Sequence, residues 1–432
     1  NIVINGDYYM FQGTASGTGI TLSGRDNVTI KNIWEIKAFE RGIYLSSSSN
    51  ISIVGNRITN NNADGIYLEA SSNNSIVGNK ITNNSGNGIY SWNYDSSTDH
   101  NRIAGNNIAN NNGDGIDFQG FGWNRASTFD YNSIAGNNIT NNSGCGIYGS
   151  GHWTSFSYSD IFRNNITNNM DGIHLSGDWS FSASYSDIVE NSIANNSGYG
   201  LYLSSGAAYN FVYHNAFVNN TQQVYSSGLV NVWDDVYPSG GNYWSNYNGT
   251  DVFSGSHQNQ TGSDGIGDTP YVIDGNNRDN YPLMKPYPWA THDIGITSVT
   301  TSKTIVGQGY NVSISIMTFN YGNYTENINI TIYADTTIIG EINNTDIASR
   351  NSTTVTFTWN TKGVAKGNYT LTVKATQIPD ETDLDDDTLI DGTVLVTIPG
   401  DVNGDRTCDM KDIYQLILHF MCKKGQPCYM PN

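Results

Sequence analysis

The sequence feature that most constrains the fold is an internal repeat with a shortest period of about 23 residues. Segments that open with Gly-Ile-Tyr-Leu or a close variant begin at Gly19, Gly42, Gly65, Gly88, Gly115, Gly146, Gly172 and Gly200. The spacing is constant up to Gly88, and the units beyond it are longer and of unequal length. Such a unit is too short for two helices, and its apolar residues alternate with polar ones as in strands. The repeat therefore predicts stacked units rich in strands.

Each unit divides into three short strands separated by polar turns, which is the pattern of one coil of a right-handed parallel β-helix. We expect the isoleucine after each repeat glycine to stack coil on coil in the interior, as a ladder of Ile43, Ile66, Ile89, Ile116, Ile147 and Ile173. An asparagine also recurs once per unit, at a turn where its amide can bond to that of the next coil. This second ladder comprises Asn56, Asn79, Asn106, Asn137, Asn164 and Asn191.

These units resemble the NosD-like, carbohydrate-associated parallel β-helix repeats over roughly residues 1–290. The resemblance includes three segments that look like the end of such modules: Gly241-Asn-Tyr-Trp-Ser-Asn-Tyr, Asp264-Gly-Ile-Gly-Asp-Thr-Pro-Tyr and Asn280-Tyr-Pro-Leu. It implies a β-helix over residues 1–238 and a C-terminal cap or linker over residues 239–290. The family covers copper-site assembly proteins, sugar-active enzymes and archaeal surface proteins, and an archaeal surface protein is our expectation.

Residues 291–398 contain some seven short alternating segments, which predict a β-sandwich of the immunoglobulin type. Asp293-Ile-Gly-Ile followed by Asn320-Tyr-Gly-Asn resembles the CARDB modules of surface proteins. The resemblance implies a spacer or an adhesive arm. The expected fold is therefore all-β, with a right-handed parallel β-helix, an Ig-like β-sandwich and a short helix that follows a calcium loop.

Residues 399–432 carry that loop. Asp401-Val-Asn-Gly-Asp-Arg-Thr-Cys-Asp-Met-Lys-Asp places side-chain oxygens at loop positions 1, 3, 5, 9 and 12, and position 7 offers a backbone carbonyl. Ca²⁺ prefers six to eight oxygen ligands, which this spacing brings together. The predicted ligands are Asp401, Asn403, Asp405, Thr407, Asp409 and Asp412. The alternative is an acidic turn at the entry to a helix that we expect from Asp409 to about Phe420.

The loop and helix resemble one half of a dockerin, and the sequence given stops where a second half would begin. We expect that half to be cleaved, disordered or supplied by a partner. The first helix would then expose an apolar face for docking on another protein or another copy of this chain, made of Ile413, Leu416, Ile417 and Phe420. A disulfide among Cys408, Cys422 and Cys428 is expected in an oxidising compartment, with the pairing left open.

The longer coils insert aromatic residues after their first strand, and stacking would collect these along one solvent-facing edge. The expected aromatic edge comprises Trp92, Tyr94, Phe121, Trp123, Trp153, Phe156, Trp179 and Phe181. Three interpretations stay open: an assembly interface, a platform on which sugars stack, or loops that pack on one another as a satellite core.

Little in the sequence indicates catalysis. The position two after each repeat glycine faces outward and is mostly tyrosine, and only Asp117 and His174 interrupt this row. Asp64, Asp114 and Asp171 precede the glycines and read as turn formers, while Cys145 reads as a small core residue. We therefore expect no catalytic residues, and without a Cys/Met/His cluster we do not expect copper handling.

The formal net charge of −19 argues against binding to nucleic-acid phosphates, and no apolar run approaches the length of a membrane span. The chain starts at an asparagine, so we expect a leader to have been removed. Sequons for N-glycosylation are frequent, and the candidates are Asn83, Asn138, Asn165, Asn311, Asn329 and Asn368. These features together indicate an exported protein at the cell surface.

The expected function is that of an extracellular structural or adhesive protein. It would assemble into a filament or lattice through its tail and its aromatic edge, with Ca²⁺ as its cofactor. Expected partners are other copies of the chain or another surface protein, and glycans. The alternative is a secreted protein that binds or degrades polysaccharides.

Overall fold

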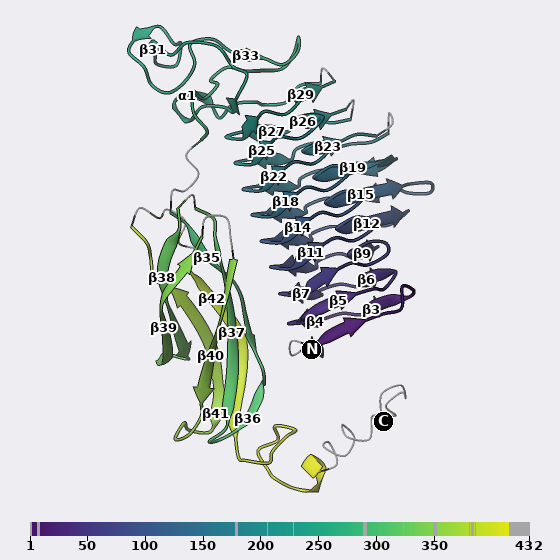
Figure 1. The fold of residues 1–432 in the computed structure, drawn as a ribbon, viewed down its shortest axis with the longest axis vertical. Coiled ribbons are helices and arrows are strands. Elements are labelled where there is room, and N and C mark those ends of the chain that lie inside the picture. The colour runs from purple at the N-terminus through teal and green to yellow at the C-terminus, as the bar shows by residue number, and fades with distance from the viewer. Residues whose placement is uncertain are drawn as a thin grey trace. The chain divides into compact units, whose positions relative to one another are not determined.

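The computed structural model divides into two compact units, residues 1–289 and 290–432, which are described separately (Figure 1). The structure describes residues 2–6, 9–177, 180–204, 206–227, 229–287, 292–322, 324–348, 352–379, 381, 384 and 386–413.

The first unit is a parallel β-helix with three long sheets, as the repeat predicted. The first sheet consists of β1 (Ile2–Asn5), β4 (Val28–Lys31), β7 (Ser52–Val54), β10 (Ser75–Val77), β13 (Arg102–Ala104), β17 (Ser133–Ala135), β21 (Asp160–Phe162), β24 (Asp187–Val189) and β27 (Phe211–Tyr213). The second consists of β2 (Met10–Gln12), β5 (Glu35–Lys37), β8 (Arg57–Thr59), β11 (Lys80–Thr82), β14 (Asn107–Ala109), β18 (Asn138–Thr140), β22 (Asn165–Thr167), β25 (Ser192–Ala194), β28 (Ala216–Val218) and β30 (Tyr243–Trp244).

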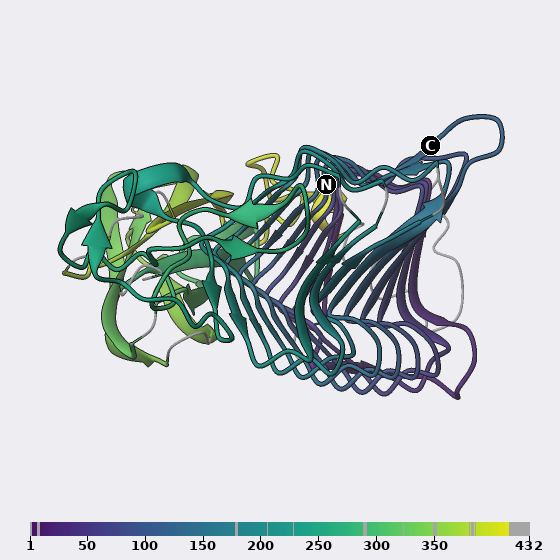
Figure 2. The same cartoon turned by 90° about the horizontal axis from the view of Figure 1, so that it is seen from above.

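The third sheet begins each repeat, and Figure 2 shows how the coils stack on one another. It consists of β3 (Thr18–Ser23), β6 (Arg41–Ser46), β9 (Ile66–Glu69), β12 (Ile89–Tyr94), β15 (Ile116–Phe121), β19 (Ile147–His152), β23 (Ile173–Leu175), β26 (Tyr199–Leu203) and β29 (Gln222–Ser226). A small sheet of β16 (Ser127–Thr128) and β20 (Thr154–Ser155) lies in the inserted loops.

The interior of the β-helix is filled by ladders of identical residues in register. Ile89 pairs with Ile66 on one side and with Ile116 on the other, and all three are buried. The repeat glycine is required because consecutive coils approach closely there. A Cβ atom on Gly88 would lie 2.6 Å from the carbonyl oxygen of Gly115 and 2.5 Å from Cγ2 of Ile108. The predicted isoleucine ladder is confirmed. The glycine before each isoleucine recurs with the same spacing because consecutive coils leave no room there for a side chain.

The predicted asparagine ladder is also present and extends beyond its expected end to Asn215 and Asn242. Along it, each Nδ2 donates to the Oδ1 of the next asparagine at 2.9–3.1 Å. A second ladder that the sequence analysis did not name runs from Asn61 to Asn220 at the next turn. Buried amides that bond to one another satisfy the polar groups of turns that water does not reach.

The C-terminal end of the β-helix is covered by aromatic side chains. The ring of Trp244 stacks on Phe217 at 4.6 Å and on Tyr271 at 4.2 Å, and its Nε1 donates to Asp279 at 2.9 Å. This region holds the short elements α1 (Val236–Ser239), β31 (Phe253–Ser254), β32 (Gln260–Thr261), β33 (Tyr271–Val272) and β34 (Arg278–Asp279). Apolar surface of the last coil is thereby removed from water.

The second unit contains two sheets that share one apolar core, which includes Ile314, Ile330 and Trp359. One sheet is formed by β35 (Ile294–Thr301), β37 (Asn311–Asn320) and β40 (Ser352–Asn360). The other is formed by β36 (Ile305–Gly307), β42 (Thr388–Thr397), β41 (Gly367–Ala375), β38 (Glu326–Ala334) and β39 (Thr337–Ile347). The immunoglobulin type of this arrangement stays a prediction.

Candidate functional site

The inserted loops of the third sheet present part of the expected aromatic edge to solvent. Trp123 is 67% exposed, Tyr94 55% and Trp153 44%, whereas Trp92 and Phe121 are half-buried. The rings of Tyr94 and Phe121 stack at 5.8 Å, which links two successive coils. The loop that follows β15 projects further from the coil than its neighbours in Figure 1. Large exposed rings on projecting loops are typical of contact surfaces.

Two members of the expected edge are not at the surface, which corrects the prediction. Phe156 and Phe181 are buried, and Phe156 contacts the core ring of Phe118 at 5.2 Å. The inserted segments form their own strand pairs, so their alternation restarts and turns these two rings inward. Trp179 lies outside the described residues. The loops therefore both extend the core and expose an edge.

A stack of rings that the sequence analysis missed lies at the turn before the first sheet. It comprises His100, Tyr131, Tyr158, Tyr185 and Tyr209, with centroids 4.9–5.4 Å apart. All five residues have left-handed backbone conformations, at positions where earlier coils carry Asn50 and Asn73. The signal was a tyrosine or histidine two positions before each of the last five strands of that sheet. Because the ring faces cover one another, mainly the ring edges and hydroxyls face water, which does not suit stacking on sugars.

The outer face of the third sheet carries the expected row of tyrosines. The rings of Tyr44, Tyr67 and Tyr90 stack at 5.0 and 5.2 Å, and beyond an interruption His174 stacks on Tyr202 at 4.2 Å. Strand alternation predicted that Asp117, at the interruption, also faces outward. It is only 2% exposed, because it lies in register between the longer side chains of Tyr90 and Tyr148.

The buried carboxyl group of Asp117 has an unusual environment. It accepts hydrogen bonds from Asn87 Nδ2 and Gln119 Nε2, both at 3.0 Å, while its Oδ1 has no hydrogen-bond partner among the described residues. Burial, with the nearby charge of Asp114, raises the pKa of Asp117 to about 8. Buried acids with raised pKa values are common at functional sites, but this one is closed to solvent.

A second cluster on the same face joins residues that the sequence analysis treated separately. One ligand atom each of Cys145, Asp171 and His174 lies within 4.8 Å of the others. His174 Nδ1 is 2.7 Å from Asp171 Oδ2, and its Nε2 is 3.0 Å from Ser176 Oγ. Such a set is able to hold a metal ion, and the Asp–His–Ser order also matches an acid–base relay. Asp171 and His174 lie three residues apart in one coil, whereas Cys145 comes from the coil before, so the sequence gave no signal that joined all three.

The tail loop is described up to Ile413. Asp401 and Asp412 are buried and accept hydrogen bonds from loop backbone groups, among them Gly404 N at 2.7 Å and Val402 N at 2.8 Å. Hydrogen bonds from Thr407 hold the pKa of Asp405 below its usual value. Of the predicted docking face, Ile413 is exposed, and Leu416, Ile417 and Phe420 lie outside the described residues.

The structure also describes one of the three tail cysteines and all six candidate glycosylation sites. Cys408 is exposed, whereas Cys422 and Cys428 lie outside the described residues. Four candidate glycosylation sites are exposed, namely Asn83, Asn311, Asn329 and Asn368. The other two, Asn138 and Asn165, are half-buried in adjacent strands and bond to each other at 2.9 Å, so they are less accessible to modification.

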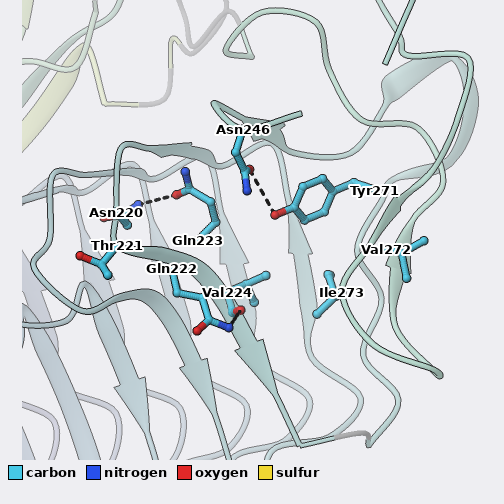
Figure 3. Close-up of a pocket in the computed structure, with 9 residues that line it drawn as sticks. All are labelled: Asn220, Thr221, Gln222, Gln223, Val224, Asn246, Tyr271, Val272 and Ile273. Atoms are coloured by element: carbon cyan, nitrogen blue, oxygen red, sulfur yellow. Dashed lines mark hydrogen bonds between the residues drawn. The ribbon is translucent and has the colours of Figure 1, made fainter. Parts of the chain in front are cut away.

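A polar pocket of about 370 Å³ lies at the capped end of the β-helix (Figure 3). It is lined by Asn220, Thr221, Gln222, Gln223, Val224, Asn246, Tyr271, Val272 and Ile273. Asn220 Nδ2 donates to Gln223 Oε1 at 2.9 Å, and the hydroxyl of Tyr271 donates to Asn246 Oδ1 at 3.2 Å. The lining is neutral, with amides and one aromatic ring.

The coil, its ladders and its capped end define a right-handed parallel β-helix protein. Residues 8–156 match the family model described as the right handed beta helix region, and residues 123–249 match that of the periplasmic copper-binding protein NosD. Over these residues the first unit resembles both families. No curated protein matches the sequence. No helix in the described part of the chain has the length and apolar character needed to cross a membrane.

Several solved structures resemble parts of the chain at low identity. A CARDB domain from Pyrococcus furiosus, in complex with di-metal ions, is 14% identical and covers 26% of this chain and 97% of its own, with a TM-score of 0.22. A pectate lyase is 13% identical over 50% of this chain and 66% of its own, with a TM-score of 0.38. The Dettilon tailspike protein is 15% identical over 72% of this chain and 58% of its own, with a TM-score of 0.34.

Proposed function

We propose that this protein is an extracellular structural or adhesive protein of the cell surface. The observation that carries the proposal is the way in which the β-helix is built. Its buried asparagine ladder bonds each coil to the next from Asn56 to Asn242. Such a rod is stiff along its whole length, which suits a protein that holds other molecules at fixed positions.

The exposed part of the aromatic edge is the proposed contact surface. Trp123 and Trp153 lie on adjacent inserted loops, and both side chains are exposed. Tryptophan is among the residues that contribute most to binding energy at protein interfaces. Where this edge contacts a different surface of the next copy, the contacts repeat without closing and yield filaments or lattices.

The tail loop supports assembly if it binds calcium. The predicted ligands fit a Ca²⁺ ion in kind, since they are carboxylates, an amide oxygen and a backbone carbonyl. Asp401 and Asp412, the first and last loop positions, are both drawn into the loop by backbone hydrogen bonds. Bound Ca²⁺ would fix the start of the following helix and so present its apolar face to a partner.

Electron microscopy of the full chain with and without a calcium chelator tests the proposal. We expect ordered filaments or sheets that disperse on chelation and that fail to form when Trp123 and Trp153 are both changed to alanine. Trp34→Ala is the matched control, because Trp34 is 58% exposed and lies outside the aromatic edge. Discrete particles under every condition would contradict the proposal.

Polysaccharide binding is the second candidate function. The neutral pocket at the capped end favours it, since amides around an aromatic ring are suited to sugar hydroxyls. A glycan array with the wild type and with Asn246→Ala distinguishes this function from pure assembly. A reducing-sugar assay on the glycans that bind then separates binding from degradation.

A further inference from the structure

We propose that Cys145, Asp171 and His174 form a binding site for Zn²⁺ or a similar borderline divalent metal ion. The thiol sulfur, a carboxylate oxygen and an imidazole nitrogen lie within 4.8 Å of one another. Zinc takes ligands of these three types, with bonds of about 2.0–2.3 Å, so small side-chain rotations bring all three onto one ion. Calcium and magnesium prefer oxygen ligands alone and are disfavoured by the sulfur.

The coil geometry places these residues together. Cys145 and Asp171 both precede a repeat glycine, and Gly146 N donates to the carbonyl oxygen of Asp171 at 2.8 Å, so the two residues lie in adjacent coils. His174 follows Asp171 by three residues on β23. The imidazole ring of His174 is held between two tyrosines of the outer row. Its centroid lies 5.4 Å from that of the Tyr148 ring and 4.2 Å from that of the Tyr202 ring.

Supporting hydrogen bonds orient the ligands. Asp171 Oδ1 accepts a hydrogen bond from Tyr199 N at 2.6 Å, which leaves its Oδ2 directed at His174. The backbone N–H of Cys145 donates to Asp114 Oδ1. The side chain of His174 is 20% exposed, which gives an ion a path from solvent. Groups that orient ligands in this way raise the affinity of metal sites.

The electrostatics of this face also favour a cation. Asp114, Cys145 and Asp171 form one row of acidic groups before successive glycines. Arg41 lies several coils away on this face, where its Nε is 3.8 Å from Oδ2 of Asp64. A divalent ion displaces the thiol proton and compensates the buried negative charge.

The site would join two coils where the chain makes its longer insertions. Cys145 precedes β19 and the other two ligands flank or lie in β23, so a bound ion bridges neighbouring strands of the third sheet. We assign the ion a structural role as a link between these coils.

Titration of the metal-free full chain with Co²⁺, in excess Ca²⁺ to occupy the tail loop, tests the site. We expect one Co²⁺ per chain, with a thiolate-to-cobalt charge-transfer band in the near ultraviolet that Zn²⁺ abolishes. Cys145→Ser should remove the band, and Cys408→Ser should leave it unchanged. A band that depends on Cys408, or no binding by the wild type, would overturn the proposal.

His174→Tyr keeps the test decisive if the cysteine variant fails to fold. It restores the residue that most coils carry at this position, so the ladder and the fold should persist. We expect its Zn²⁺ affinity to fall at least tenfold and the Zn²⁺-dependent rise in melting temperature to vanish. Ser176→Ala should retain both properties, because Ser176 contacts His174 but is not a ligand. Equal Zn²⁺ affinity in the wild type and in His174→Tyr would contradict the proposed metal site.

Discussion

The side-chain amide of Asn106 donates a hydrogen bond to the side-chain oxygen of Asn137 at 3.0 Å, although both residues are buried. The same oxygen accepts the backbone N–H of Asn106, also at 3.0 Å, and the amide of Asn137 donates in turn to Ile103 and Asn164. The side chain of Asn137 thus satisfies polar groups in the two coils on either side of its own.

Replacement of Asn137 by alanine should lower the free energy of unfolding by about 3 kcal/mol, since it leaves several buried groups without partners. Chemical denaturation of the β-helix measures this loss. Asn107→Ala, on an exposed strand position, should change stability by less than about 0.5 kcal/mol. Similar losses in both variants would show that the ladder does not stabilise the fold.

Gly115→Ala should destabilise the β-helix by about 1–3 kcal/mol through overpacking. The new Cβ would lie 2.4 Å from Cγ2 of Ile139 and 2.6 Å from the carbonyl oxygen of Gly146. Gly275→Ala is the control, because nothing lies within 4 Å of a Cβ there. The melting temperature of the two variants measures the difference, and an unchanged value for Gly115→Ala would argue against the close approach of the coils.

Stability of the β-helix should fall as the pH rises from about 4 to about 8. The raised pKa of Asp117, about 8 against an ordinary value of 3.8, means that the folded state keeps a proton which the unfolded state has released. The folded state therefore binds more protons across this window, and the free energy of unfolding decreases with pH until both states are ionised.

Asp117→Asn should remove the part of this slope that Asp117 contributes, so that the stability of the variant relative to the wild type increases with pH. Asp279, whose pKa burial raises to about 7, leaves a residual slope in the variant. Melting temperatures across the window provide the measurement. Parallel profiles for the two proteins would contradict the buried position of Asp117.

Phe156→Ala should cost about 3–5 kcal/mol, whereas Trp153→Ala should cost less than about 1 kcal/mol. The first removes a ring that contacts Phe118 in the core, and the second removes a ring that is 44% exposed. Denaturant unfolding of both variants tests the division of the inserted loops into core and surface. A larger loss of stability for Trp153→Ala than for Phe156→Ala would contradict this division.

Calcium should protect the tail loop from trypsin at Arg406 and Lys411. Both residues lie between predicted ligands, and Arg406 is exposed. Limited proteolysis with Ca²⁺ and with a chelator measures the protection, which Asp405→Ala should abolish because it removes one predicted ligand. Asp346→Ala, on the sandwich, is the control. Cleavage at equal rates in Ca²⁺ and chelator would contradict the calcium loop.

The coil was predictable because period, alternation and a recurring glycine position repeat within one chain. The positions of Ile43 and Asn56 could be predicted from that pattern alone, since each residue occupies the same place in every unit. Burial of Asp117 did not follow from alternation, which assigns a face to a residue but says nothing of the length of its neighbours. Phe156 and Phe181 were misplaced because insertions restart the alternation. The cluster at Cys145 and His174 depends on the stacking of one coil on the next, so no local sequence motif indicated it.

The hydrogen bonds between coils run parallel to the rod axis, and this direction determines how the molecule responds to force. Tension applied to its ends loads the contacts of each coil in series, so the weakest coil detaches before the others. A detached coil of the shortest length, about 23 residues, releases roughly 80 Å of extended chain, and the longer coils release more. A rod of this kind would lengthen in discrete steps under load and dissipate energy at each step, while the remaining coils stay stacked.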